Sequence, residues 1–321
     1  MKQKQNRFVT LLREIWKAKY LYLLLIPFLA WLIMFSYVPM SGVVLAFKKF
    51  NARLGIWGSE WIGLKHFQRI FITPAAVEAI KNTITLSLQR IFWEFPAPIL
   101  MALLITELRG DRLKKVYQTI FTFPHFISWV VVSQLLTVLF SDAGGVNMLL
   151  SSLGFDKIAF LADGEFFKSM LFITANWKEM GWAAIVYMAA IAGIDPTLYE
   201  AASIDGATRL KQIWHITLSS LKPIIAIQFI LKVGGIMNAG FSQIFNMRNA
   251  AVKSAVQIID SYIYDITFGA KPDYGFSTAV GLFKSLINFA LLLFANWLVG
   301  RMTGEKMFSF KKEKVKKEVM K

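Results

Sequence analysis

The sequence predicts an all-α, polytopic membrane protein with six transmembrane helices. Hydrophobic residues make up 56% of the 321 residues and charged residues only 17%, below the roughly 25% typical of soluble domains. The apolar residues form long stretches instead of recurring at every second or fourth position, so each segment is apolar on all sides. Helices of this kind face lipid or one another, which predicts a membrane-spanning bundle.

The first apolar stretch covers residues 20–47 and contains no Asp, Glu, Lys or Arg. It is too long for the hydrophobic region of a signal peptide and has no small-residue cleavage site, so we expect it to remain as a membrane anchor. Five further stretches each offer the roughly 20 apolar residues that a span requires. The predicted spans are 20–45, 80–105, 117–140, 168–193, 223–245 and 277–300.

Basic residues predict the orientation of these spans. With six spans both termini lie on one side, and the segments on that side hold 21 Lys and Arg against 9 in the alternate loops. Because cytoplasmic loops are enriched in Lys and Arg, both termini are predicted to be cytoplasmic. The loop 46–80 holds five of the 9, and we interpret it as a structured outer segment. The expected divisions are a cytoplasmic segment (1–19), a transmembrane domain (20–300) and a basic cytoplasmic tail (301–321).

Several classes of function are disfavoured by composition. The net charge of +16 comes from basic residues that flank apolar runs, a pattern that indicates an anionic membrane surface and no nucleic acid. Cysteine is absent and the three histidines are scattered, so no metal site is expected. The sequence has no GxxxxGK[ST] phosphate-binding loop, so any ATPase must be another chain, and no cofactor is expected in this one.

The segment 195–223 between the fourth and fifth predicted spans has the strongest local signals. Asp195 is suited to cap a helix and Pro196 to begin it. Gly206 is suited to end it at a left-handed turn. A second amphipathic stretch follows before Pro223, where the next span is expected to start. We therefore expect two short helices, joined at the glycine and parallel to the cytoplasmic membrane surface.

This segment resembles the EAA loop of type I ABC importer permeases, whose pattern is E-A-A, three residues, G-A, and an apolar stretch ending in I-x-L-P. Ser219 replaces the usual proline at the end of that pattern. The resemblance implies that the first helix docks into a groove of a separate ATPase, with small side chains allowing close approach and acidic ones pairing with basic residues there. The matching residues are Glu200, Ala201, Ala202, Asp205, Gly206 and Ala207.

Other stretches, at 39–50, 61–67, 82–88, 123–132 and 277–298 and at GGVNMLL, are similar to carbohydrate permeases of the YteP and LplB type. The resemblance implies a type I importer fold in a bacterial plasma membrane. It also implies a second homologous permease, two copies of a cytoplasmic ATP-binding subunit that holds ATP and Mg, and an extracytoplasmic sugar-binding protein. The implied substrates are oligosaccharides, including acidic sugars derived from pectin or rhamnogalacturonan.

Ionisable residues inside predicted spans are costly and call for partners or water. Arg90 and Glu94 are four residues apart, so we expect them to pair on one helix face. Lys178 and its neighbour Glu179 are expected not to face one another. Lys232 and Lys284 are interpreted as lone cations beside a wet cavity, an arrangement suited to an anionic sugar. Aromatic and amide side chains complete the predicted substrate path, which comprises Asn176, Trp177, Lys178, Lys232, Asn238, Gln243, Lys284 and Asn288.

Three alternatives remain. An ion-coupled secondary transporter would be expected to show inverted repeats and a helix broken at mid-membrane, neither of which is evident in the sequence. A permease for a non-sugar solute would share all the features above. An integral membrane enzyme would require a converging catalytic set, and no paired carboxylates or Ser-His arrangement stands out.

Overall fold

The computed structural model describes residues 16–303, so most of the predicted N-terminal segment and of the basic tail lies outside the described part. The prediction of an all-α protein is confirmed, the described residues being helical apart from turns and one two-stranded antiparallel pair. Within residues 16–303, five helical segments are long and apolar enough to cross a membrane. A sixth is obtained if α11 (Gly164–Ala192) and α12 (Pro196–Ile204), which meet at a bend of 69°, count as one span.

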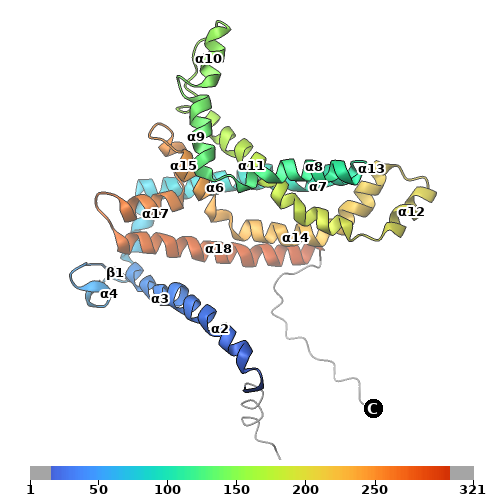
Figure 1. Ribbon diagram of the computed structural model, residues 1–321. Helices are drawn as coiled ribbons and strands as arrows, with labels where there is room; N and C mark the ends of the chain where they lie inside the picture. Colours follow the sequence, from blue (N-terminus) through green and yellow to red (C-terminus); the bar gives the residue numbers. More distant parts are fainter. Residues whose placement is uncertain (1–15, 304–321) are drawn as a thin grey trace, which may run out of the picture.

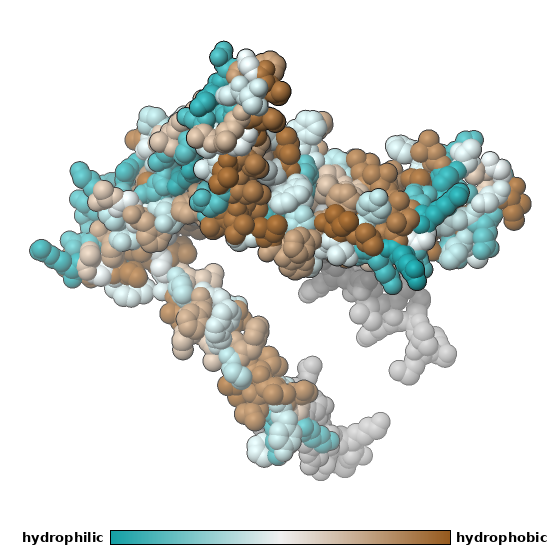
Figure 2. Space-filling model, turned by 45° about the horizontal axis from the view of Figure 1, so that its top comes forward, coloured by the Kyte–Doolittle hydropathy of each residue, from teal (hydrophilic) through white to brown (hydrophobic). Residues whose placement is uncertain are grey.

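The first span is a continuous helical segment, Lys19–Phe47, that stands away from the body (Figure 1). None of the side chains of its first part, α2 (Lys19–Leu32), is buried in this chain. Hydrophobic side chains cover α2 and the middle of the body, whereas hydrophilic ones gather toward the ends (Figure 2). The rest of the span comprises η1 (Ile33–Tyr37), α3 (Val38–Met40) and η2 (Ser41–Phe47).

The loop 46–80 is an ordered structure. Its short strands pair through Lys48 and Trp61, and the buried Lys48 Nζ donates hydrogen bonds to the carbonyl oxygens of Ile56 (3.0 Å) and Trp57 (2.8 Å). The elements are β1 (Lys48–Lys49), α4 (Gly55–Gly58), β2 (Glu60–Trp61) and α5 (Lys65–Ile72).

The second span consists of α6 (Pro74–Glu94) and α7 (Pro96–Glu107), and the fourth is α11. Helix α11 packs along α7 and α8 (Asp111–Thr122). Its apolar face contributes Phe167, Met170 and Leu171 to the largest buried cluster, which also includes parts of α6, α9 and α15.

The predicted third span, 117–140, is not one helix. It is interrupted by η3 (Phe123–Phe126), and Ser128 caps the new helix α9 (Trp129–Phe140) by accepting a hydrogen bond from Val131 N. The physical reason is Pro124, which lacks the N–H that a continuing helix would need. A second short helix, α10 (Gly145–Ser152), extends from α9.

The predicted fifth span, 223–245, is also wrong in its limits. The helix begins at Arg209 and runs to Gly234 without a separate second short helix, so Pro223 lies inside it. It then breaks, because Ala239 (φ 43°) and Gly240 (φ 77°) adopt left-handed backbone conformations that end a right-handed helix. The elements are α13 (Arg209–Gln212), η4 (Ile213–Thr217), α14 (Leu218–Gly234), η5 (Ile236–Asn238) and α15 (Phe241–Met247).

The sixth span, α18 (Tyr274–Thr303), packs along α14 and against the region 259–268. Gly234 makes the α14 contact close, because a Cβ atom there would lie 2.5 Å from Leu292 Cδ1. The elements that precede α18 are α16 (Lys253–Val256) and α17 (Ile259–Phe268).

Candidate functional site

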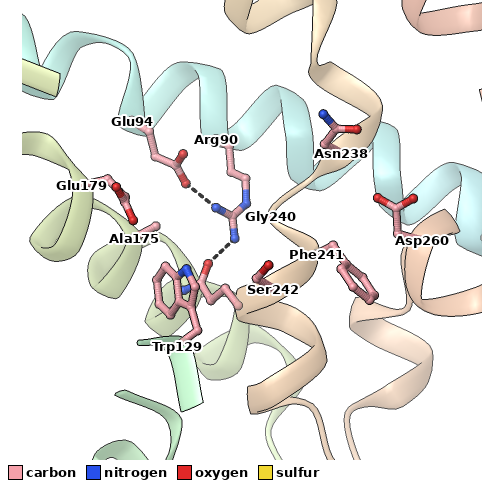
Figure 3. Close-up of a pocket in the computed structure, with 11 residues that line it drawn as sticks. Arg90, Glu94, Trp129, Ala175, Glu179, Asn238, Gly240, Phe241, Ser242 and Asp260 are labelled. Carbon is pink, nitrogen blue, oxygen red and sulfur yellow. Dashed lines mark hydrogen bonds and ion pairs between the residues drawn. The ribbon is translucent and has the colours of Figure 1, made fainter. Parts of the chain in front are cut away.

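A polar cavity lies beside the break in the fifth span (Figure 3). Its volume is about 410 Å³, and a second cavity of about 250 Å³ shares Arg90, Glu94, Asn238 and Gly240 with it. The two cavities therefore adjoin. The larger is lined by Arg90, Glu94, Trp129, Ala175, Glu179, Asn238, Gly240, Phe241, Ser242, Gln243 and Asp260.

Arg90 and Glu94 form the centre of this site. The predicted pair is confirmed, with 2.8 Å between Arg90 Nη1 and Glu94 Oε1. Lys232 is not a lone cation, because its Nζ lies 3.0 Å from the other oxygen of Glu94. Arg90 Nη2 donates to Gln243 Oε1, and Gln243 in turn donates to Leu171 O at 2.8 Å. One carboxylate thus holds two cations from different spans, and the guanidinium is fixed from both sides.

The break in the fifth span is shaped around Arg90. A Cβ atom on Gly240 would lie 2.6 Å from the guanidinium carbon of Arg90, so glycine is required both by this contact and by its positive φ. The freed backbone groups have partners, since Ser87 donates to Ile236 O and Asn288 Oδ1 accepts from Met237 N at 3.1 Å. Irregular backbone at membrane depth is tolerated where such partners exist and where it lines a cavity.

Glu179 lines another side of the larger cavity, and Lys178 lies beside it outside the lining. They do face one another, contrary to the prediction, with Nζ and Oε1 3.1 Å apart. Their long side chains bend toward a common third group, since Lys178 Nζ also donates to His125 O (2.5 Å) and Glu179 Oε2 lies 2.7 Å from His125 Nδ1. Lys178 is buried and lies over the ring of Trp129, 5.5 Å from its centroid.

Lys284 is also paired, contrary to the interpretation as a lone cation. Its Nζ lies 2.6 and 2.7 Å from the two carboxylate oxygens of Asp260. Asp260 lines the larger cavity from α17, so the ion pair borders the site although Lys284 itself is not among the lining residues.

The remaining predicted path residues are distributed differently. Asn238 and Gln243 line the larger cavity, and Lys232 lines the smaller one. Asn176 lies beside a separate pocket, where it donates to Trp93 O at 3.3 Å. Trp177 is 41% exposed and lines none of these pockets.

Sequence reasoning missed Trp129, Phe241, Ser242 and Asp260. Trp129 and Phe241 supply the aromatic surfaces in the cavity, a role that sequence analysis gave to Trp177. The available signal was their position directly after helix breaks, since Trp129 follows the Pro124 interruption and Phe241 follows Gly240.

The segment 200–207 lies far from this cavity, on a short helix at the opposite end of α14 (Figure 1). Asp195 caps α12 by accepting a hydrogen bond from Thr197 N at 3.0 Å, and this bond lowers the pKa of Asp195. Gly206 ends the helix with φ 74°, and the space around its Cβ position is open. Glu200 and Asp205 are exposed, and Ile204 is 87% exposed. This end of the molecule therefore presents an exposed helix with acidic and apolar side chains.

The inner face of α12 is tied to the start of the next helix. The hydroxyl groups of Tyr199 and Thr217 lie 2.8 Å apart, and buried Gln212 donates to Ser203 Oγ at 2.9 Å. A third link joins Arg209 Nε to Glu107 Oε2 at 2.6 Å, at the end of the second span. Displacement of α12 would thus be transmitted to both α14 and α7.

Comparison with known proteins identifies the family. Residues 94–304 match the family described as binding-protein-dependent transport system inner membrane component. The chain belongs to this family. It is a membrane-embedded permease subunit of a bacterial ABC transporter and not an enzyme, because ATP hydrolysis in such systems is the task of a separate subunit.

Two relatives from Bacillus subtilis (strain 168) cover nearly the whole permease. The polygalacturonan/rhamnogalacturonan transport system permease protein YteP is 42% identical over 309 residues, covering 96% of this chain and 95% of the relative. Protein LplB is 41% identical over 295 residues, covering 91% of this chain and 92% of the relative.

Solved structures agree with this assignment. A chain from the crystal structure of a bacterial ABC transporter involved in the import of the acidic polysaccharide alginate matches with a TM-score of 0.84 and 38% identity, over 92% of this permease and 99% of that chain. A second structure of the alginate transporter, in complex with an alginate pentasaccharide-bound periplasmic protein, matches with a TM-score of 0.83 and 37% identity, over 92% and 98% of the two chains. The type I importer permease fold expected from the sequence is confirmed.

Proposed function

We propose that this permease forms, with a second homologous permease, the translocation path of an oligosaccharide importer that works by alternating access. Two copies of an ATP-binding subunit would bind ATP and Mg. Their movement would be transmitted to the permease through residues 200–207 and would open and close the path. An extracytoplasmic binding protein would deliver the sugar. The observation that carries the proposal is the exposed helix α12, whose inner face is bonded to η4 through Tyr199–Thr217 and to α13 through Ser203–Gln212, at the start of the continuous helix Arg209–Gly234.

The proposed substrates are acidic oligosaccharides derived from pectin or rhamnogalacturonan. The names of two similar proteins support this class, since one transports polygalacturonan and rhamnogalacturonan and the other imports alginate, all acidic polymers. The cavity is compatible with a sugar, since it combines aromatic surfaces with hydrogen-bonding groups.

The proposed orientation places both termini and α12 in the cytoplasm. It is supported by the excess of Lys and Arg in the terminal segments and in the loops on that side. The loops 46–80, 141–167 and 246–276 would then face outward, where a binding protein docks.

An ion-coupled secondary transporter was expected to contain a helix broken at mid-membrane. The break at 235–240 follows the continuous helix Arg209–Gly234, so it does not decide for or against that alternative. Membership of the binding-protein-dependent family argues against it, because transport in this family is powered by an ATPase. A non-sugar solute remains the second candidate, and transport assays with sugars address it directly.

Docking at α12 can be tested by changing Gly206→Leu. A bulky side chain would project from the open docking surface, so the ATPase recovered with the purified permease should fall at least tenfold, equivalent to about 1.4 kcal/mol. Gly63→Leu is a matched control, because Gly63 also has positive φ (62°) and open space around its Cβ position, but lies in the outer segment. Equal ATPase recovery with both variants would contradict the proposal.

A further inference from the structure

The ionic groups around the two cavities are unequally balanced. Glu179 is engaged by Lys178, and Asp260 by Lys284, one carboxylate for each cation. Arg90 and Lys232, in contrast, share the single carboxylate of Glu94. In the part of the chain that the structure describes, the linings of the two cavities hold no carboxylate other than Glu94, Glu179 and Asp260. The Arg90–Glu94–Lys232 cluster therefore carries one positive charge in excess.

An uncompensated charge inside a membrane protein is costly and calls for a partner. The C-terminal end of α14 offsets part of the cost, because Lys232 lies in its last turn, where the helix dipole favours a cation. That end supplies only a partial charge. An anion in the cavity would complete the balance.

The two cations differ in what they can offer such an anion. Arg90 is buried at 7% exposure, and both of its terminal nitrogens are already bonded to Glu94 and Gln243. Of its five N–H donors, the one on Nε is buried without a hydrogen-bond partner among the described residues, so a ligand cannot reach that atom. The side chain of Lys232 is 39% exposed and lines the smaller cavity. Of its three N–H donors, one points to Glu94, which leaves two for a ligand.

We propose that Lys232 binds a carboxylate of a uronate unit and that Glu94 positions its ammonium group without neutralising the site. The inference rests on the proposed function and assigns the charge selectivity to one residue. A sugar ring in the larger cavity would contact Trp129 and Phe241, and the carboxylate of a neighbouring unit would reach Lys232 in the adjoining cavity. Charge-assisted N–H···O bonds of this kind are roughly twice as strong as neutral ones.

The test measures uptake by the complete transporter in proteoliposomes, with trigalacturonate and its methyl triester as probes of similar size and different charge. The wild type should favour the acid. Lys232→Met should lower the ratio of acid to ester uptake about tenfold, whereas Lys232→Arg should keep it within about threefold. Lys222→Met is the matched control, because Lys222 is an exposed lysine of the same helix, and its ratio should equal that of the wild type.

A second variant guards against a misfolded Lys232→Met. Glu94→Gln removes the shared carboxylate and should raise the acid-to-ester ratio, a direction that simple structural damage would not produce. An unchanged ratio in Lys232→Met, or a ratio in Glu94→Gln that stays level or falls, would overturn the inference. A wild-type transporter that imports neither probe would instead contradict the proposed function, whatever the variants do.

Discussion

The backbone of Gly181 in α11 lies against the carbonyl group of Phe121 in α8, so that a Cβ atom on residue 181 would be 2.0 Å from that oxygen. The next residue, Trp182, stacks on His125, with 4.4 Å between ring centroids and 3° between ring planes. Both contacts lie at the interruption of the third span. They fix α8 and the interruption against α11, so these parts are expected to move as one body.

Gly181→Ala should therefore be strongly destabilising. Backbone must shift to admit the methyl group, and overpacking of this kind costs about 3 kcal/mol or more. Gly281→Ala is the control, because a Cβ atom there meets nothing nearer than 3.8 Å and alanine is favoured over glycine inside a helix by about 1 kcal/mol. Thermal unfolding in detergent should show a lower midpoint for Gly181→Ala only, and equal midpoints would refute the close contact.

Tyr199→Phe should weaken the coupling between ATP hydrolysis and sugar import. The change removes the hydroxyl that meets Thr217 at 2.8 Å and leaves the ring in place, with an expected cost of about 1 kcal/mol. We expect more ATP hydrolysed per sugar imported in proteoliposomes, because α12 would move without carrying α14 fully. Tyr264→Phe, in α17, should leave this ratio unchanged, and a similar ratio in both variants would argue against the link.

The loop 246–276 should lose stability in acid through Asp265, which lies in α17. Burial raises the pKa of this carboxyl, but the hydrogen bonds and charges of Arg248 and Lys253 outweigh it and lower the pKa overall. A carboxyl whose pKa is lowered by folding stabilises the protein above its unfolded pKa of about 4, and this contribution disappears as the pH falls through the lowered value.

Asp265→Asn should thus lower the unfolding temperature at pH 7 and leave it close to that of the wild type near pH 3. Asp142→Asn, at an exposed position of the α9–α10 connection, controls for the loss of one negative charge. A difference in unfolding temperature between the wild type and Asp265→Asn that is the same at pH 7 and pH 3 would contradict the expectation.

The orientation can be tested because the chain contains no cysteine. Single cysteines at Ser152 and Thr208, both exposed, should differ in their reaction with a membrane-impermeant maleimide. The cysteine at 152 should react in intact cells, and the one at 208 only after permeabilisation. The reverse pattern would place α12 outside and remove the basis for docking an ATPase.

Composition was sufficient to predict the helical class, because apolar stretches of span length have few alternatives in lipid. It could not reveal the interruptions in the third and fifth spans, since the residues on both sides remain apolar. Pro124 and the glycines at 234, 235 and 240 were the available signals. The break after α14 also depends on Ser87 and Asn288, which bond the backbone groups of Ile236 and Met237 and lie far away in sequence.

Ion pairing was predictable only at short range. Arg90 and Glu94 share a helix face, so their spacing was enough. Lys232 finds Glu94 across 138 positions of sequence, and no periodicity encodes that contact. The ion pair between Lys178 and Glu179 was not predicted, because adjacent residues point in different directions on a helix. Their side chains are flexible enough to converge on His125, which both contact.

The unbroken helix Arg209–Gly234 has a mechanical consequence. Its 26 residues make a rod about 39 Å long, with the end that is bonded to α12 at one tip and the ammonium of Lys232 near the other. A tilt of about 5° would swing the distal tip by roughly 3 Å over that length. This displacement is as large as the 3.0 Å separation of the Lys232 ammonium from Glu94, so a small tilt would be enough to break that ion pair and shift the ammonium within the cavity.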